Sequence, residues 1–385
     1  MKRKDYNAIF NGINNLDKYH GQVTGMFTCD EHLNGKNPTQ GSELCTVSES
    51  LFSLESVWEV YPDQVELLDR IESIAYNALP GTIDETFTSH QYDQQANQVL
   101  VTRGKRNWYN NNDDSNLFGL EPNFVCCTAN MHQGWPKLSY SLFLAKQDGG
   151  IMAGVYAPCD LTYVNANGIQ INITEETEYP FDEYIKFTVN PKIECEFEFK
   201  LRIPSWCNSS FVKVNGLLID SKPSGFYSLI RRWKKGDIVE LILPMDVRVT
   251  HRYHNAISVL RGPIVYALEI KESWKKLQDH SLYGDWEIYP DSDWNYTILL
   301  NEKDLKTSFK VQKHDFLKQP FSHTPPVSIL CKGKKIPNWE LNDNSAGDLP
   351  YSPVVSNEPT VDLRLIPYGG AKLRISEIPY MVNNI

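Results

Sequence analysis

The 385-residue sequence contains no long apolar run, because its longest apolar stretches are the length of a β-strand. A membrane-spanning helix needs roughly 18–20 consecutive apolar residues. The sequence also lacks an excess of positive charge: its net charge is −10, and basic residues are interspersed with acidic ones. No basic stripe is available to bind phosphates. We therefore expect neither a membrane nor a nucleic acid as a partner.

The sequence shows no secretion signal either. Its first residues are basic, but polar residues follow where a signal peptide has its apolar core. The eight cysteines are spread along the chain without the even framework that small secreted domains use. We therefore expect mostly reduced cysteines and a cytoplasmic location.

The first part of the chain, residues 1–148, has a helical pattern. Apolar residues recur every three or four positions and predict four amphipathic helices, over residues 6–19, 44–57, 65–75 and 128–145. A loop rich in Asn, Asp and Gln, over residues 82–124, separates the last two helices. Loops of this length in a compact domain are usually functional or disordered.

An alternation by two replaces the helical pattern near residue 150. Short runs separated by turn residues predict strands over residues 169–173, 196–203, 211–214 and 238–243. This is the signature of a β-sandwich, and we expect that domain to span residues 149–270. A passage rich in Lys, Trp and Asp, residues 271–295, resembles a domain boundary. The remainder, with its clearest strands at 361–366 and 372–375, predicts a second, smaller β module over residues 271–385.

Two adjacent cysteines, Cys126 and Cys127, precede the fourth predicted helix. Neighbouring Cα atoms lie only about 3.8 Å apart, so an ordinary disulfide between them is strongly disfavoured. Together with Glu43 and Cys45 they offer three thiolates and one carboxylate, which would fill a tetrahedral zinc site. A metal-held thiolate is also a strong nucleophile, and an unbound Glu nearby could donate a proton. The alternative is that these cysteines are small, buried core residues.

Several segments resemble the zinc-dependent β-L-arabinofuranosidase family, glycoside hydrolase family 127 and its relatives. The most specific are Glu43-Leu-Cys45 and the turn Cys126-Cys127-Thr-Ala-Asn130, which leads into Gly134-Trp-Pro-Lys137. Further similar segments lie at residues 25–33, 201–206, 261–263, 367–369 and 373–375. The resemblance therefore runs through most of the chain.

The resemblance implies an α plus all-β multidomain fold, in which incomplete (α/α)6-barrel helices precede two β-sandwich, jelly-roll-like domains. The barrel helices would lie in residues 1–148 and the sandwiches in residues 149–270 and 271–385. Family members carry an N-terminal segment that supplies most of the barrel. We therefore expect one of three cases: the sequence is a truncated piece, self-association or a second polypeptide completes the barrel, or the chain is not an active enzyme by itself.

The resemblance also implies a retaining glycosidase that removes terminal β-L-arabinofuranosyl or similar residues from a carbohydrate substrate. Glu43, Cys45, Cys126 and Cys127 match the zinc ligands, Cys126 matches the nucleophile, and Glu31 matches the general acid/base. Asp30, beside Glu31, is a rival for the acid/base role. A non-catalytic or carbohydrate-binding fragment with a structural zinc is the alternative function.

The loop over residues 90–97 lies between the two pairs of expected metal ligands. Its polar side chains are of the kind that bind sugar hydroxyls. We expect Tyr92 and His90 to contact substrate, with Tyr92 the stronger candidate. The alternative is an ordinary hydrogen-bonded loop.

Overall fold

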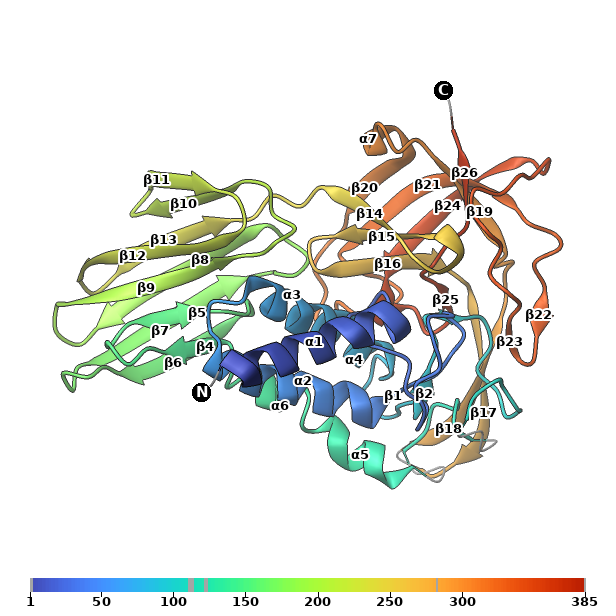
Figure 1. The fold of residues 1–385 in the computed structure, drawn as a ribbon, viewed down its shortest axis with the longest axis horizontal. Helices are drawn as coiled ribbons and strands as arrows, with labels where there is room; N and C mark the ends of the chain where they lie inside the picture. Colours follow the sequence, from blue (N-terminus) through green and yellow to red (C-terminus); the bar gives the residue numbers. More distant parts are fainter. Residues whose placement is uncertain (1–2, 110–113, 121–123, 282, 384–385) are drawn as a thin grey trace. The chain divides into compact units, whose positions relative to one another are not determined.

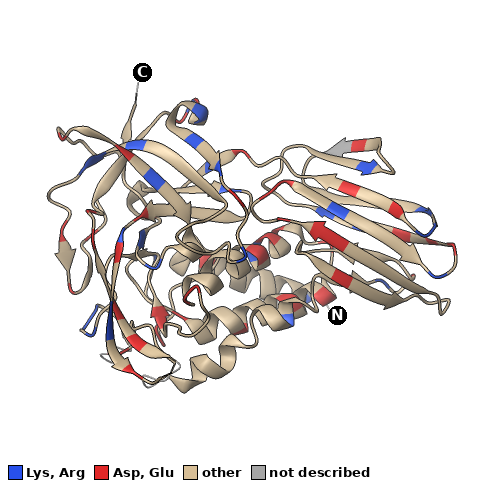
Figure 2. Cartoon of the chain, turned by 180° about the vertical axis from the view of Figure 1, so that it is seen from behind, with Lys and Arg blue, Asp and Glu red and all other residues tan. Residues whose placement is uncertain are grey.

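The computed structural model describes residues 3–109, 114–120, 124–281 and 283–383. The chain consists mostly of strands and separates into two compact units (Figure 1). The first unit comprises Met1–Ser50, Ser73–Gly134 and Val247–Ile385, and the second comprises Leu51–Glu72 and Trp135–Asp246. Acidic and basic residues are interspersed along the strands of both units (Figure 2). Within the described ranges, no helix is long and apolar enough to cross a membrane.

Most helices lie in the N-terminal part of the chain. They are α1 (Arg3–His20), α2 (Leu44–Val60), α3 (Val65–Ser73), α4 (Leu79–Gly81), α5 (Val125–Met131), α6 (Trp135–Leu138) and α7 (Leu305–Ser308). A π-helical turn, Ile74–Ala78, joins α3 to α4. The first three predicted helices are therefore confirmed.

The fourth predicted helix is wrong beyond Met131. The chain turns at Gly134, begins the short helix α6 and then forms strand β4 (Phe143–Ala145). A Cβ at Gly134 would come within 2.6 Å of Leu79 Cδ2, so only glycine fits this turn without a shift. Pro136 follows in the first turn of α6, where a missing N–H costs no helical hydrogen bond. The apolar spacing alone could not reveal this interruption.

The second unit contains two sheets. One has the order β12-β9-β5-β4 and adds β12 (Gly225–Trp233), β9 (Cys195–Ile203) and β5 (Ile151–Ala153) to β4. The other has the order β11-β10-β13-β8-β7-β6 and comprises β11 (Leu217–Lys222), β10 (Ser210–Val214), β13 (Asp237–Ile242), β8 (Tyr184–Pro191), β7 (Gln170–Thr177) and β6 (Cys159–Val164). Phe187 on β8 packs edge-on against Phe143 and Phe199 of the first sheet. The strands predicted between residues 169 and 243 are confirmed.

A buried ion-pair network also stabilises the second unit. The side chain of Arg202, on β9, is fully buried and contacts Asp69 at 2.7 Å and Glu72 at 2.5 Å, both on α3. Tyr179 donates a hydrogen bond of 2.6 Å to the other carboxylate oxygen of Glu72. Burial raises the pKa of Glu72, and the neighbouring Arg202 charge opposes that rise. The network thus ties helix α3 to the sheet through the fully buried charges of Arg202 and Glu72 and the partly exposed Asp69.

Replacement of Arg202 by methionine should strongly destabilise the second unit. Arg202→Met leaves the carboxylate of Glu72 buried without its cation, so we expect the free energy of unfolding to fall by about 3–5 kcal/mol. Chemical denaturation measures this change. Arg232→Met is the control, because Arg232 is exposed and forms a long ion pair of 3.7 Å with Glu194. The change in its free energy of unfolding should stay within about 0.5 kcal/mol. A cost below about 1 kcal/mol for Arg202→Met would contradict the assigned role.

The first unit is built on a ten-stranded sheet with the main order β14-β15-β16-β24-β21-β19-β26. Its strands are β14 (Val247–His251), β15 (Ile257–Arg261), β16 (Ile264–Glu269), β24 (Thr360–Pro367), β21 (Val327–Lys335), β19 (Tyr296–Leu300), β26 (Tyr380–Val382), β20 (Phe309–Lys313), β25 (Arg374–Ile375) and β3 (Asn97–Gln98). Strands within residues 247–269 thus pair with C-terminal strands. The sequence instead led us to expect these residues in the β-sandwich domain that ends at residue 270. An alternating pattern identifies a strand but not its partner.

The passage over residues 271–295, expected to be a boundary, instead forms a hairpin of β17 (Glu272–Asp279) and β18 (Gly284–Pro290). The remaining short strands are β1 (Ser42–Glu43), β2 (Asp93–Gln94), β22 (Leu341–Asn342) and β23 (Ser345–Ala346). The predicted long loop over 82–124 therefore contains β2 and β3. Residues 110–113 and 121–123 of that loop lie outside the described residues.

Buried polar side chains fix the segment 91–98 against the C-terminal strands. Tyr368 donates a hydrogen bond of 2.8 Å to the Gln94 side chain, and Arg374 donates one of 3.0 Å to the Gln95 carbonyl. The Asn97 side chain accepts from the backbone N–H groups of Ser376 and Glu377, both at 2.9 Å. Because buried polar groups are costly unless they are paired, these bonds define one position for the segment.

Candidate active site and metal centre

The four expected metal ligands meet in one cluster. Glu43, Cys45, Cys126 and Cys127 bring one carboxylate oxygen and three sulfur atoms within 4.8 Å of one another. The sulfur atoms of Cys45 and Cys127 are 3.3 Å apart, although 82 positions separate these residues in the sequence. Cys127 is buried and Cys126 is exposed. The cluster therefore has one sulfur atom that an external molecule can approach.

Strand pairing and a helix terminus position Glu43 and Cys45. Strand β1 pairs antiparallel with β2, and this places Glu43 opposite Asp93. The N–H of Leu44 donates to the Tyr92 carbonyl at 2.9 Å. Cys45 follows in the first turn of α2. The partial positive charge of a helix N-terminus favours the thiolate form of a cysteine there.

Two side-chain contacts hold helix α5 beside this strand pair. The ring of Phe124, just before α5, stacks on Tyr92 with a centroid distance of 3.8 Å. The Thr128 hydroxyl donates to the Leu120 carbonyl at 2.5 Å, so it accepts the hydrogen bond of 2.8 Å from His90 Nε2. These contacts fix the first turn of α5, which carries Cys126 and Cys127.

Glu31 stands beside the cluster in an unusual backbone conformation. Its φ is +68°, a region that residues other than glycine rarely adopt and that often marks functional sites. The Tyr92 hydroxyl donates a hydrogen bond of 2.8 Å to Oε1 of the exposed Glu31. The backbone of Cys29 accepts from Glu43 N–H at 2.9 Å, which ties the Glu31 segment to β1. Glu31 is near enough to Glu43 to contribute to raising its pKa.

Asp30 has a different environment from Glu31. Its side chain is fully buried, and Oδ2 accepts the backbone N–H of Tyr109 at 2.6 Å. Burial raises the pKa of Asp30. The two adjacent carboxyl groups thus differ in solvent exposure, because Asp30 is buried and Glu31 faces solvent.

His90 and Tyr92, the two expected substrate contacts, are both 3% exposed. Thr128 engages Nε2 of His90, and Glu31 engages the hydroxyl of Tyr92. The structure therefore shows them as supports of the site, while their direct contact with a sugar stays a prediction.

The electrostatics of the cluster favour a bound cation. Burial, and next the charge of Cys45, raise the pKa of Glu43 to about 8. Hydrogen bonds, first from Cys127, lower the pKa of Cys45, whereas burial raises the pKa of Cys126. Four acidic groups this close cannot all ionise without a compensating charge. A divalent cation would supply it, and a set of three sulfur atoms and one oxygen suits zinc rather than magnesium or calcium.

Several supporting residues carry no signal in the sequence. Phe124 contacts Tyr92 and Thr128 contacts His90, each more than thirty positions away in the sequence. No local sequence pattern reveals such contacts. Asn130 is an exception, because it hydrogen-bonds Cys45 from a position four residues after Cys126 on α5. Residues at this spacing share one helix face.

Comparison with known proteins finds one matching family model and several similar solved structures. The family model described as "Beta-L-arabinofuranosidase, GH127 middle domain" matches residues 150–245. No curated protein sequence matches the chain. A solved structure of Ara127N-Se, a GH127 β-L-arabinofuranosidase from Geobacillus stearothermophilus T6, shares the fold with a TM-score of 0.68 and 21% identity, covering 96% of this chain and 55% of that one.

Two further solved structures share the fold. One is described as "Glycoside hydrolase", with a TM-score of 0.66, 22% identity, and coverage of 90% of this chain and 54% of that one. The other is the GH127 β-arabinofuranosidase BT3674, with a TM-score of 0.59, 18% identity, and coverage of 90% and 51%. The chain thus spans about half the length of each solved structure.

The mixed, strand-rich fold is the one seen in these solved structures. Residues 150–245 match the model of the GH127 middle domain, so the sequence similarity to that family lies in this part of the chain. The resemblance to glycoside hydrolase family 127 noted from the sequence is confirmed.

Proposed function

We propose that this chain carries the catalytic cluster of a retaining glycoside hydrolase that removes terminal β-L-arabinofuranosyl or similar residues. The observation that carries the proposal is the convergence of Glu43, Cys45, Cys126 and Cys127 within 4.8 Å, beside a Glu31 carboxylate that Tyr92 holds. The same four residues would bind zinc, and that ion would keep their sulfur atoms as thiolates at neutral pH.

Cys126 is the nucleophile in this proposal, because it is the exposed thiol of the cluster. Its sulfur attacks the anomeric carbon while Glu31 gives a proton to the leaving glycosidic oxygen. A carbon–sulfur bond forms as the carbon–oxygen bond breaks, so the sugar is held covalently on Cys126. Glu31 is left as a carboxylate.

Water completes the reaction. Glu31 now accepts a proton from a water molecule, whose oxygen attacks the anomeric carbon, and the Cys126 sulfur leaves as a thiolate. Two displacements at one carbon retain its configuration. Asp30 fits the acid/base role less well, because its buried carboxyl is already bonded to the Tyr109 N–H.

The sugar specificity rests on the relatives alone. Two of the similar solved structures are described as β-L-arabinofuranosidase or β-arabinofuranosidase. We also propose that α1 to α6 belong to an (α/α)6 barrel whose other helices come from outside this sequence, and that the sheets form β-sandwich, jelly-roll-like domains. We also propose the cytoplasmic location expected from the sequence, in which the cysteines form no even framework.

Metal analysis is the first test of the cluster. The purified chain should contain about one zinc ion, because a complete set of four donors is present. Elemental analysis should show its loss in Cys45→Ala. Cys29→Ala is the matched control and should keep the metal, since the Cys29 thiol is not among the four grouped donor atoms. A folded chain without zinc, or equal zinc in both variants, would overturn the metal assignment.

Activity measurements test the two catalytic roles. On a nitrophenyl β-L-arabinofuranoside, Cys126→Ser and Glu31→Gln should each lower kcat/KM by about 10²- to 10⁴-fold, because each removes a group that reacts in the transition state. Asp30→Asn should keep most of the activity. Near-normal activity in Cys126→Ser or Glu31→Gln would exclude that residue. Sugar binding that is insensitive to Cys126→Ser, without hydrolysis, would favour a carbohydrate-binding fragment with a structural zinc.

Tyr92→Phe separates two roles for Tyr92. The variant keeps the ring that stacks on Phe124 but loses the hydrogen bond to Glu31. If Tyr92 positions Glu31, kcat should fall about 10- to 100-fold with little change in KM. A higher KM with unchanged kcat would instead show that the hydroxyl contacts substrate. Tyr140→Phe, at a residue 90% exposed, is the control.

A further inference from the structure

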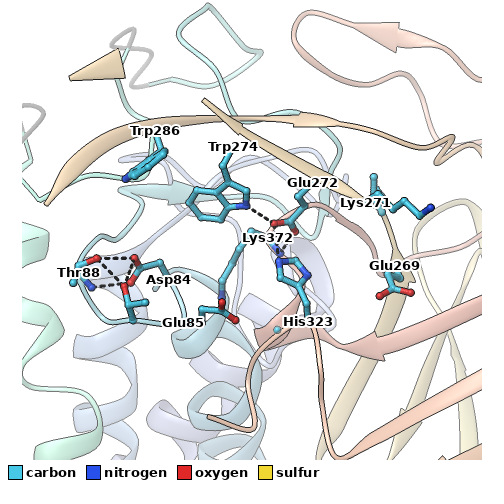
Figure 3. Close-up of a pocket in the computed structure, with 13 residues that line it drawn as sticks. Asp84, Glu85, Thr88, Glu269, Lys271, Glu272, Trp274, Trp286, His323 and Lys372 are labelled. Atoms are coloured by element: carbon cyan, nitrogen blue, oxygen red, sulfur yellow. Dashed lines mark hydrogen bonds and ion pairs between the residues drawn. The ribbon is translucent and has the colours of Figure 1, made fainter. Parts of the chain in front are cut away.

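A cavity of about 620 Å³ lies in the first unit, and none of the cluster residues lines it. Its walls come from residues 84–88, 269–272, the hairpin β17–β18, His323, Gly370 and Lys372 (Figure 3). This volume is within the range of small-molecule sites, about 300–1,000 Å³. The cavity is thus large enough for a ligand that the proposed reaction does not account for.

Two tryptophan side chains form one side of the cavity. Trp274 and Trp286 extend from β17 and β18, with ring centroids 6.0 Å apart and planes at 74°. Trp274 also packs on Phe118 at 5.5 Å, and its Nε1 donates to Glu272 at 2.9 Å. The indole of Trp274 therefore has a fixed orientation and offers a flat apolar face. Such a face suits the C–H groups on one side of a sugar ring.

Hydrogen-bonding groups form the other side. Asp84, Glu85 and Thr88 face the indoles across the cavity (Figure 3). Asp84 accepts hydrogen bonds of 2.9 Å from the hydroxyls of Thr86 and Thr88, and one of 2.8 Å from the Thr88 N–H. This turn is therefore ordered before any ligand arrives. Its carboxylates and hydroxyls can accept from, or donate to, the hydroxyl groups of a sugar.

The charges between these two sides are already paired. The Glu272 side chain is 2% exposed; it contacts His323 at 3.1 Å and accepts the N–H groups of Lys372 and Leu373 at 2.8 Å. Lys372 is buried and donates to the Pro80 carbonyl at 2.8 Å. Glu269 pairs with Arg364 at 2.6 Å. The other charged groups of the lining carry both signs, because Asp84 and Glu85 are acidic and Lys271 is basic. A neutral ligand whose hydroxyls can bond to either sign therefore fits best.

We propose that this cavity is a second carbohydrate-binding site, which takes a neutral oligosaccharide with one sugar ring stacked on Trp274 and its hydroxyls bonded to Asp84 and Glu85. The site goes beyond the proposed hydrolysis and does not depend on it. It would hold a stretch of glycan without cleaving it.

Calorimetric titration of the full chain tests the site. The background is Glu31→Gln, so that substrate is not consumed, and the probes are arabinotriose and xylotriose. We expect saturable binding of at least one trisaccharide, weakened about tenfold or more when Trp274→Ala is added. Trp206→Phe, in the second unit, is the matched control and should leave the affinity unchanged. Trp274→Ala alone should hydrolyse a nitrophenyl arabinofuranoside at the normal rate.

A second variant guards against misfolding of Trp274→Ala. Glu85→Ala changes an exposed loop residue and should also weaken binding, while circular dichroism should match that of the parent. The proposal is overturned if neither trisaccharide binds, whether or not the diamine cadaverine does, or if binding is unaffected by both variants. The unsubstituted chain could bind a trisaccharide in a Trp274-dependent way and yet hydrolyse no arabinofuranoside. That result would overturn the proposed catalysis but not the proposed binding site.

Discussion

The acidic side chains of Glu43, Cys45, Cys126 and Cys127 repel one another whenever more than one of them is ionised, and this constraint dominates the first unit. Their donor atoms lie within 4.8 Å, in surroundings that raise the pKa of Glu43 to about 8. Such an arrangement lowers the stability of the fold unless a positive charge compensates the ionised groups. The four donor atoms therefore suit the coordination sphere of a cation, and Cys126 is the exposed member of the cluster.

The scaffold that enforces this proximity is polar rather than apolar. Segment 91–98 supplies β2, which pairs with the Glu43 strand, and Tyr92, which contacts both Phe124 and Glu31. The same segment is fastened by Arg374 and by the Asn97 bonds to the C-terminal strands. Hydrogen bonds are directional, so a buried polar network specifies a single position more sharply than apolar packing does. Precision at the site thus depends on residues almost three hundred positions away in the sequence.

The second unit also contains buried charged side chains, and there they have opposite signs. Arg202 is buried together with Glu72, and the two compensate each other without any bound ion. The cavity beside Trp274 shows the same principle, since Glu272 contacts His323 and accepts the backbone N–H of Lys372. In the Glu43 cluster, by contrast, all four donor groups are acidic.

The sequence by itself determined the segments with regular periodicity, namely helices α1 to α3 and strands β7, β9, β10, β13 and β24, because side-chain spacing reports directly on local geometry. It also determined the donor set, since Glu43-Leu-Cys45 and the Cys126–Cys127 pair are short and chemically specific. Only the tertiary structure decided how these parts meet. It gave residues 247–269 to the C-terminal sheet, turned residues 271–295 into a hairpin that lines a cavity, and placed Glu31 rather than Asp30 in solvent. Those outcomes depend on contacts between residues far apart in the chain, which no local pattern encodes.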